Sequence, residues 1–515
     1  TVPGILRDAA RLHGEAPALA EARADGAIGR CWTYAELLAD AERLALALST
    51  RFAPGERIAV WAPNLPEWEI LEFAAGMAGL VLVTINPAYQ AKELRYVLTQ
   101  SRAVALFLTR EYRGNPMARI AAEVTADIPA IRCVVDMEDP AALYARGDRG
   151  AVLPDVRPGD TAQIQYTSGT TGFPKGALLH HSGLTNNARY TLGRMEPEPR
   201  DTFLNPMPMF HTAGCAIVTL GSVQFGARHI LVRQFDPGHM IALMESERVC
   251  LGFGVPTMII AMLEAFDRQP RDVSALRVMM SGGAMVPPEI VRRTQDTFGC
   301  DFEIVYGQTE TSPVITLLRR SDSFADKTET AGQALPQTEI AIRDAATGAV
   351  VPVGAVGEIC ARGHGIMQGY NDNPEATAQA IDAEGWLHTG DLGTLDARGY
   401  LRITGRLKDM IIRGGETLFP AEIENVLLEH PAIAEVSVVG VPDDKWGEIA
   451  VCFFRPAGAL PKREELVAHV RKHLAAPKTP AHWIAVESFP LTGSGKIQKF
   501  VLRDRFIAGE FASRL

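Results

Sequence analysis

The stretch Tyr166-Thr-Ser-Gly-Thr-Thr-Gly-Phe-Pro-Lys-Gly176 packs three glycines, four Ser/Thr hydroxyls and one lysine into eleven positions. It follows the apolar run 162–165, which predicts a strand ending in this loop. Glycines let a backbone approach a polyphosphate, hydroxyls and amides donate to its oxygens, and Lys175 adds positive charge. The segment does not contain the P-loop spacing Gly-x-x-x-x-Gly-Lys-Ser/Thr. An ordinary turn is the alternative, but the lysine and the strand context favour a phosphate-binding loop.

The sequence around this loop alternates between strand-like and helical patterns. Strand-like runs occur at 57–61, 81–85, 103–108 and 131–135, and helical patterns at 34–48 and 91–100. This alternation is typical of a parallel α/β sheet. The same rhythm resumes after Thr161 and continues through Ile304, which predicts a second layered α/β unit packed on the first.

The composition and the predicted secondary structure of the sequence change twice toward the C-terminus. Residues 332–400 contain short strands punctuated by Gly, Asp and Pro, as in a small β-rich subdomain. After Arg406 we expect a helix at 421–429, a strand at 436–441 and a helix at 464–474. The predicted fold is α/β: a large N-terminal body of layered α/β subdomains and a β-rich subdomain, residues 1–405, followed by a small mobile α+β domain, residues 406–515.

Composition excludes several classes of function. The 515 residues carry a formal net charge of −10, whereas a nucleic-acid-binding protein needs a basic face. The seven cysteines form no CxxC pair and no metal-ligand cluster with histidine, which fits a reduced, cytoplasmic setting. Residues 1–14 lack the pattern of a secretory signal. The most apolar stretch, 70–85, is interrupted by Glu72 and two glycines, so we expect a buried helix and strand and no integral membrane segment.

Six further motifs follow the pattern of one enzyme superfamily. They are Met207-Pro-Met-Phe-His-Thr-Ala-Gly214, Ser281-Gly-Gly-Ala284, Tyr306-Gly-Gln-Thr-Glu310, Thr389-Gly-Asp391, Gly405-Arg-Leu-Lys-Asp-Met-Ile-Ile-Arg-Gly-Gly415 and Pro490-Leu-Thr-Gly-Ser-Gly-Lys-Ile-Gln-Lys499. With the phosphate loop, they make the whole chain resemble the adenylate-forming superfamily of acyl-CoA synthetases, adenylation domains and beetle luciferases. Within it, Ile85–Leu94, Gly307–Val314 and Lys408–Glu416 are most similar to medium-chain acyl-CoA synthetases.

The resemblance implies a site for ATP and Mg²⁺. Tyr306 would stack on adenine, Thr309 would contact the α-phosphate, and Glu310 would hold Mg²⁺ with help from Thr167. Asp391 lies in a Gly-rich turn and would bind the ribose hydroxyls, with Arg406 as a second contact. The remaining nucleotide-binding residues would be Ser168, Gly169, Thr170, Thr171, Gly172, Lys175, Gly283, Ala284, Gly307 and Gln308.

The resemblance also implies a domain rotation between two half-reactions. Lys496 would enter the site and bridge the acid's carboxylate and the α-phosphate, where an ammonium offsets developing charge. Lys408 occupies the hinge position, and Gly414 and Gly415 would let the pantetheine arm of coenzyme A pass. His211 would act as an aromatic gate near the thiol tunnel. We read His180 and His181 as structural.

The predicted reaction is an AMP-forming carboxylate:CoA ligation, in which an acyl-adenylate forms, pyrophosphate leaves and the thiol of CoA displaces AMP. The acyl pocket is expected at 207–211, 253–256, 282–285 and 307–314, which contain no lysine or arginine and so favour an uncharged aliphatic or aryl acid. The alternatives are an enzyme that loads a carrier protein, a luciferase-like oxygenase and an inactive ligand-binding relative. The oligomeric state is left open, a homodimer included.

Overall fold

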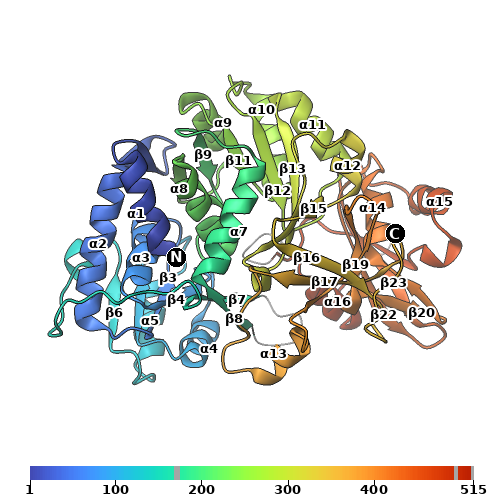
Figure 1. Cartoon of the computed structure of the whole chain (residues 1–515). Helices are drawn as coiled ribbons and strands as arrows, with labels where there is room; N and C mark the ends of the chain where they lie inside the picture. The colour runs from blue at the N-terminus through green and yellow to red at the C-terminus, as the bar shows by residue number, and fades with distance from the viewer. Residues whose placement is uncertain (168–173, 492–496, 512–515) are drawn as a thin grey trace. The chain divides into compact units, whose positions relative to one another are not determined.

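The computed structural model describes residues 1–167, 174–491 and 497–511. The chain divides into two compact units, Thr1–Glu339 with Ala361–Leu387, and Ile340–Cys360 with His388–Leu515. Figure 1 gives the labels of the helices and strands. The predicted boundary after residue 405 marks a domain expected to rotate about a hinge at Lys408, and this boundary stays a prediction.

A six-stranded sheet in the order β6-β5-β3-β4-β7-β8 forms the first layer of the larger unit. Its strands are β3 (Arg57–Trp61), β4 (Val81–Ile85), β5 (Ala105–Leu108), β6 (Cys133–Asp136), β7 (Thr161–Thr167) and β8 (Lys175–His180). The accompanying helices are α1 (Val2–His13), α2 (Tyr34–Arg51), α3 (Pro66–Met77), α4 (Ala91–Ser101), α5 (Met117–Thr125) and α6 (Pro140–Leu143). All strand pairs are parallel except β7–β8, which is an antiparallel hairpin.

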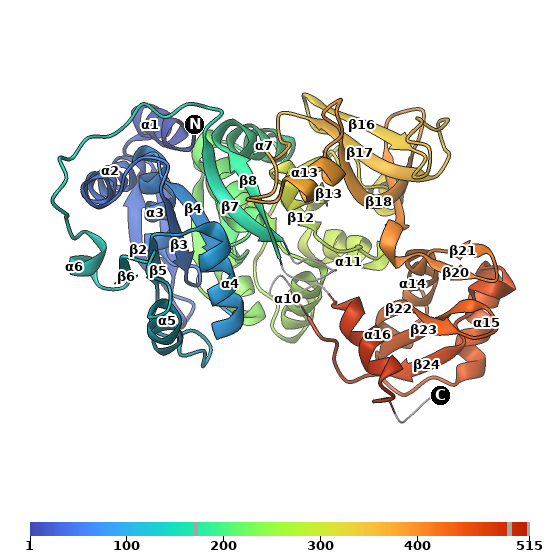
Figure 2. The same ribbon diagram turned by 90° about the horizontal axis from the view of Figure 1, so that it is seen from below.

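Alternation along the strands explains why helices cover both faces of this sheet (Figure 2). In β3, Ile58 and Val60 join an apolar core with α2 and α3, whereas Ala59 and Trp61 join another with α4 and α5. Successive strand side chains point to opposite faces, so an apolar run buries both. Helix α2 begins where Thr33 and Glu36 form a capping box.

A nine-stranded sheet in the order β15-β14-β13-β12-β11-β9-β10-β1-β2 forms the second layer of the same unit. Its strands are β1 (Pro17–Ala22), β2 (Ile28–Thr33), β9 (Thr202–Asn205), β10 (Arg228–Val232), β11 (Leu251–Phe253), β12 (Val278–Gly282), β13 (Asp301–Gly307), β14 (Val314–Leu317) and β15 (Gln333–Ala334). The helical segments are α7 (His181–Arg194), the π-helix η1 (Ala213–Leu220), α8 (Gly221–Phe225), α9 (Pro237–Ser246), α10 (Pro256–Arg268), α11 (Pro288–Phe298), the 3₁₀ turn η2 (Thr309–Thr311) and α12 (Phe324–Glu329).

The expected α/β fold is confirmed, but sheet membership differs from the simple order of the sequence. Strands β7 and β8 belong to the first sheet, although the second α/β unit was predicted to begin after Thr161. Strands β1 and β2, near the N-terminus, belong to the second sheet because β1 pairs with β10. Periodicity identifies a strand, but the pairing partner depends on contacts distant in sequence.

The smaller sheets complete the fold. A four-stranded sheet has the order β16-β17-β18-β19, and a five-stranded sheet has the order β21-β20-β23-β22 with β24 beside β23. Their strands are β16 (Thr338–Arg343), β17 (Gly357–Gly363), β18 (Leu387–Leu395), β19 (Leu401–Arg406), β20 (Ile411–Arg413), β21 (Glu416–Leu418), β22 (Ile433–Asp443), β23 (Gly447–Pro456) and β24 (His482–Ala485). The helical segments are α13 (Pro374–Ala380), η3 (Leu407–Asp409), α14 (Pro420–Leu428), α15 (Arg463–His473), η4 (Ala476–Lys478) and α16 (Lys499–Ile507).

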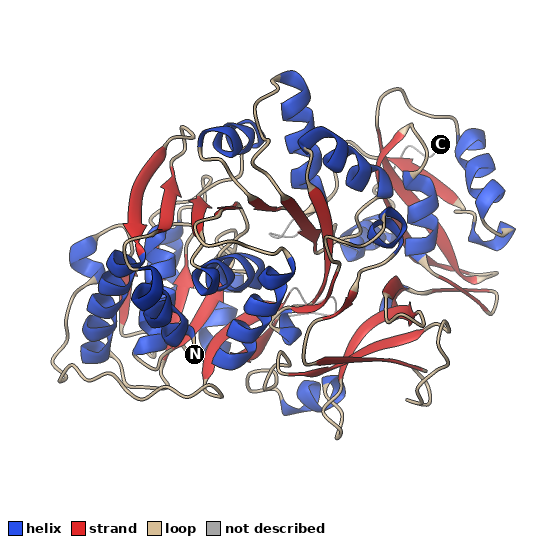
Figure 3. Cartoon of the chain, turned by 45° about the horizontal axis from the view of Figure 1, so that its top comes forward, coloured by secondary structure: helices blue, strands red, loops and turns tan. Residues whose placement is uncertain are grey.

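The predicted α+β character of residues 406–515 is confirmed. Helices α14 and α15 share an apolar core with one face of the five-stranded sheet, and α16 packs on the other face (Figure 3). The helices expected at 421–429 and 464–474 and the strand expected at 436–441 correspond to α14, α15 and part of β22. Among the described residues, no helix is long and apolar enough to cross a membrane.

Candidate active site

The two ends of the predicted phosphate loop are fixed by the β7–β8 hairpin. Thr167 is the last residue of β7, Lys175 is the first of β8, and the two are cross-strand partners. The Thr167 hydroxyl donates to the Lys175 carbonyl oxygen at 3.4 Å. Ser168, Gly169, Thr170, Thr171 and Gly172 lie outside the described residues. The hairpin therefore presents a hydroxyl and an ammonium group on either side of the loop.

Lys175 belongs to a chain of contacts that ends at Glu310. The Lys175 ammonium nitrogen lies 4.9 Å from the centre of the Tyr370 ring. The Tyr370 hydroxyl donates to Glu310 Oε1 at 2.7 Å. Burial, and then the charge of Glu310, raise the pKa of Tyr370, so the phenol stays protonated and remains a donor. Tyr370 thus orients the carboxylate predicted to hold Mg²⁺.

Tyr370 is a residue that the sequence reasoning missed. It pairs with Ala177 in an isolated β-bridge, and the neighbouring Asn371 N–H donates to the Gly176 carbonyl oxygen at 2.7 Å. The segment 368–371 therefore runs antiparallel beside β8. Tyr370 lies 60 positions after Glu310 in the sequence, so no local spacing connects them.

The predicted Tyr306–Glu310 motif forms a tight turn at the carboxyl end of β13. Tyr306 is 9% exposed and Glu310 8%, while Gly307, Gln308 and Thr309 are half-buried. The Gln308 N–H donates to the Pro313 carbonyl oxygen at 2.9 Å. A Cβ on Gly307 would lie 1.9 Å from that same oxygen, so only glycine fits here.

Two other residues predicted to bind the nucleotide lie just beyond the carboxyl end of β12, the strand next to β13. Gly282 ends β12 and pairs with Val305 of β13, and the exposed Gly283 and Ala284 follow directly. Ligands of α/β sheets bind beyond the carboxyl ends of strands. The structure therefore brings Gly283, Ala284 and the Tyr306–Glu310 turn to one edge of the nine-stranded sheet.

Three of the four stretches predicted to line the acyl pocket meet in one apolar cluster. Met207, Phe253, Val255 and Val314 are all buried in it, together with residues of α7 and η1. His211 lies just before η1, and its Nδ1 accepts the Ala213 N–H at 3.1 Å. This bond puts the proton of a neutral His211 ring on Nε2. π-Helical turns such as η1 often occur at functional sites.

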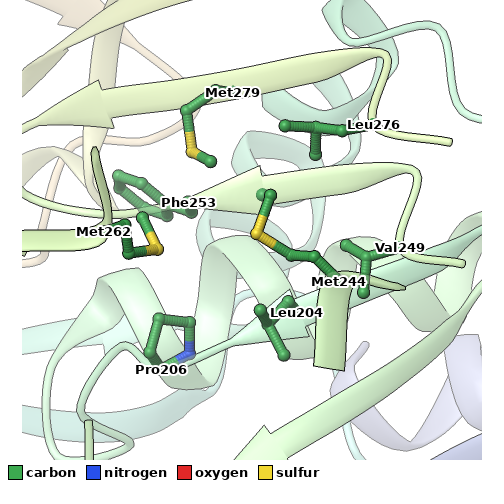
Figure 4. Close-up of a pocket in the computed structure, with 9 residues that line it drawn as sticks. Leu204, Pro206, Met244, Val249, Phe253, Met262, Leu276 and Met279 are labelled. Atoms are coloured by element: carbon green, nitrogen blue, oxygen red, sulfur yellow. The ribbon is translucent and has the colours of Figure 1, made fainter. Parts of the chain in front are cut away.

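Phe253 also lines a small apolar cavity. Figure 4 shows the methionine side chains that point into it, those of Met244, Met262 and Met279. The remaining lining residues are Leu204, Pro206, Val249, Gly252, Phe253 and Leu276. Only Phe253 belongs to a stretch predicted from the sequence.

The predicted ribose-binding residues lie in the second unit. The Arg406 Nε donates to Asp391 Oδ1 at 3.0 Å. Asp391 was expected in a turn, but it lies within strand β18, opposite Arg406 on β19. The prediction of a turn was wrong because the Gly390 signal is local, whereas pairing with β19 extends the strand.

Glu358, which the sequence reasoning also missed, supports this strand. Its Oε1 accepts the Gly390 N–H at 3.1 Å, and its Oε2 lies 2.8 Å from His388 Nδ1. The Thr389 hydroxyl donates to the Ile359 carbonyl oxygen at 2.6 Å. Residues 388–390, which directly precede Asp391 in β18, are thus held by hydrogen bonds to β17.

The residues predicted to act through the domain rotation are also in this unit. Gly414 and Gly415 form the turn of the β20–β21 hairpin with φ of 58° and 87°, a pair of values that favours glycine. Lys408 lies in the 3₁₀ turn η3. Lys496 lies outside the described residues.

The predicted structural histidines have contacts that fit that role. His180 Nδ1 accepts the Gly183 N–H at 2.9 Å at the start of α7. His181 Nδ1 accepts the Val2 N–H at 3.3 Å, and burial lowers the pKa of His181 to about 4. His181 is therefore neutral at physiological pH.

Family models match both parts of the chain. The model described as "AMP-binding enzyme" matches residues 6–371, and "AMP-binding enzyme C-terminal domain" matches residues 422–496. The chain belongs to the AMP-binding enzyme family. It is an AMP-forming acyl-CoA synthetase, a ligase of the adenylate-forming superfamily that uses ATP and coenzyme A.

Similar proteins of this AMP-binding family agree with that assignment. The mitochondrial medium-chain acyl-CoA ligase ACSF2 of Bos taurus is 34% identical over 509 residues, covering 92% of this chain and 83% of the relative. The feruloyl-CoA synthase of an Amycolatopsis species is 38% identical over 480 residues, covering 93% of this chain and 94% of the relative. The crystal structure of ATP-bound MatB from Rhodopseudomonas palustris has a TM-score of 0.87 and 28% identity, with 98% of this chain and 99% of that one covered.

Proposed function

We propose that this acyl-CoA synthetase activates an uncharged aliphatic or aryl carboxylic acid, such as a medium-chain fatty acid. The observation that carries the proposal is the apolar cluster formed by Met207, Phe253, Val255 and Val314. The four stretches predicted to line the pocket contain no lysine or arginine. A second carboxylate or an ammonium group buried there would lack a counter-charge, which costs several kcal/mol, roughly 2 to 7 even for an uncharged polar group.

We assign the nucleotide to the edge formed by the β7–β8 hairpin and the Tyr306–Glu310 turn. Carboxylate and hydroxyl oxygens are the ligands that Mg²⁺ prefers, so Glu310 and Thr167 fit the ion that this family resemblance implies. Bound there, Mg²⁺ would neutralise charge on the phosphates. Lys175 adds a positive charge beside the loop, and Tyr370 keeps the Glu310 carboxylate in one orientation.

A screen of acids tests the substrate class. CoA-dependent AMP production is measured with straight-chain acids of increasing length, benzoic and cinnamic-type acids, dicarboxylic acids and amino acids. We expect the highest kcat/KM with an uncharged aliphatic or aryl acid. A dicarboxylate or an amino acid as the best substrate would refute the proposal.

A pair of phenylalanine variants tests the location of the pocket. Phe253 belongs to the apolar cluster and also lines the methionine-lined cavity, so Phe253→Ala should open space toward the cavity and shift the preference toward longer acids. Phe298→Ala removes an equally buried ring from the other apolar core of the same sheet. It should lower stability without changing the preferred length, and an equal shift in both variants would argue against the assignment.

A pair of glutamate variants tests the nucleotide site. Glu310→Ala should lower the rate of pyrophosphate release severely while leaving the fold intact. Glu303→Gln changes a buried carboxyl group on β13, the strand that precedes the Glu310 turn, and should leave the apparent Mg²⁺ requirement unchanged. If Glu310→Ala retains the wild-type rate and Mg²⁺ dependence, Glu310 is not the metal ligand.

A further inference from the structure

Helices α14 and α15 bring together three side chains that can bind a transition metal. Glu429 directly follows α14, and His469 and His473 lie one turn apart on α15. One ligand atom of each residue lies within 4.8 Å of the others. The two helices pack against each other (Figure 1). Histidines at i and i+4 share one face of a helix, which is the spacing with which helical pairs bind zinc.

The hydrogen bond of His469 favours a metal-binding tautomer. Its Nε2 donates to the Val426 carbonyl oxygen, near the C-terminal end of α14, at 2.7 Å. A ring that carries its proton on Nε2 has a lone pair on Nδ1. Metal-binding histidines characteristically donate their other ring N–H to a carbonyl or carboxylate oxygen, which fixes the ring.

The nearby His430 is bound differently. Its ring centre lies 5.0 Å from that of His469, but its Nδ1 accepts the Ala432 N–H at 3.2 Å. In the neutral ring the proton is therefore on Nε2, and neither nitrogen offers a lone pair. His430 makes a matched control, because it is a histidine of the same cluster that should not bind the metal.

The electrostatic setting suits a cation. Glu429 and the last carbonyl groups of α14 both place negative charge at this end of the helix. Glu465 lies one turn before His469 on the same face of α15. Arg471 lies on the side of α15 opposite the face shared by His469 and His473, and Lys472, three positions after His469, borders that face.

We propose that Glu429, His469 and His473 form a binding site for a divalent transition metal, with Zn²⁺ as the ion of choice. Two imidazoles and one carboxylate are a common zinc ligand set, with water completing the tetrahedron. The bound ion would join the end of α14 to the last turn of α15. The site is separate from the residues assigned to ATP and the acid, and Mg²⁺ would not replace Zn²⁺ because imidazole is a poor ligand for Mg²⁺.

Calorimetric titration of the full-length, untagged chain with Zn²⁺ tests the site. A Cys31→Ser background removes the exposed thiol as a competing ligand. We expect one Zn²⁺ per chain, at least tenfold weaker binding in His473→Asn and Glu429→Gln, and a change of less than twofold in His430→Asn. The side chains of Glu429 and His473 are exposed, so the variants at these two positions should fold.

Two further measurements distinguish binding at this site from binding by other side chains, cysteines in particular. Zn²⁺ should raise the Tm of the Cys31→Ser chain and of His430→Asn, but not that of His473→Asn. Co²⁺ bound in place of Zn²⁺ should show no thiolate-to-cobalt absorption. The proposal is overturned if no Zn²⁺ binds, if His430→Asn weakens binding as much as His473→Asn, or if a thiolate band shows that a cysteine holds the ion.

Discussion

The hydroxyl of Tyr370 is the atom whose removal tests the Lys175–Tyr370–Glu310 contacts most directly. Tyr370→Phe keeps the ring beside Lys175 but removes the donor to Glu310. A hydrogen bond to a charged group contributes roughly 1.5–3 kcal/mol. We therefore expect kcat/KM for MgATP to fall about ten- to a hundredfold in a pyrophosphate-release assay, with little change in Tm.

Tyr144→Phe is the matched control for this prediction. Tyr144 also lies under a cation, because the Arg43 guanidinium is 4.0 Å from its ring centre. Its hydroxyl has no part in the proposed site, so activity should stay at the wild-type level. Equal activity of Tyr370→Phe and Tyr144→Phe would mean that Glu310 needs no such orientation.

Strand β17 has a testable effect on strand β18 through Glu358. The carboxylate accepts the Gly390 N–H and contacts His388, and these residues precede Asp391. Glu358→Gln retains one acceptor oxygen but loses the charge. We expect KM for ATP to rise about tenfold while kcat stays close to wild type, since Asp391 would be less well positioned and not removed. A fall in kcat with unchanged KM would contradict this positioning role.

Helix α3 carries a buried carboxyl group that should make stability depend on pH. Glu72 accepts a hydrogen bond from Gln163 at 2.6 Å. Burial, and then the nearby Glu69, raise the pKa of Glu72 well above its ordinary value. The folded chain keeps Glu72 protonated at a pH where the unfolded chain ionises it, so the wild type loses stability as pH rises above about 4.3.

Glu72→Gln resembles the protonated acid and removes this dependence. We expect its Tm to exceed that of the wild type at pH 8 and to approach it near pH 4. Glu264→Gln, on the exposed face of α10, should show no such difference. A Tm gain that is the same at both pH values would show that ionisation of Glu72 is not the cause.

At the scale of the whole molecule, the predicted hinge should separate the two half-reactions. Lys408 lies in the first turn of a 3₁₀ segment, where proline is tolerated. Lys408→Pro fixes φ and should restrain the rotation, so acyl-adenylate forms but its transfer to CoA slows. Lys408→Ala changes the side chain without fixing φ. Equal transfer rates in these two variants would argue against the hinge.

Lys496→Ala should have the converse effect. The resemblance implies that Lys496 contacts the α-phosphate only during adenylation, so that step should lose roughly a hundred- to a thousandfold in rate. With preformed acyl-adenylate and CoA, thioester formation should stay close to wild type. Rapid-quench measurement of each half-reaction decides the matter, and equal damage to both would refute the two-pose mechanism.

The sequence predicted those features that depend on neighbours along the chain. Strands β3 and β4, helix α2 and the Tyr306–Glu310 turn are encoded by local periodicity and motif. The sheet to which β1 or β7 belongs was not predictable, because it depends on distant partners. Tyr370 and Glu358 were missed for the same reason, since their hydrogen bonds cross 60 and 32 positions.

The β7–β8 hairpin also has a consequence for how this family can diversify. Thr167 and Lys175 are the final pair of a ladder that begins at Thr161 and His180, so the ladder sets their separation. Substitutions between them can alter affinity for the nucleotide without displacing the anchoring residues. Transplanting residues 168–174 from a relative should therefore be a conservative route to new kinetic properties, because the sheet would not need to be redesigned.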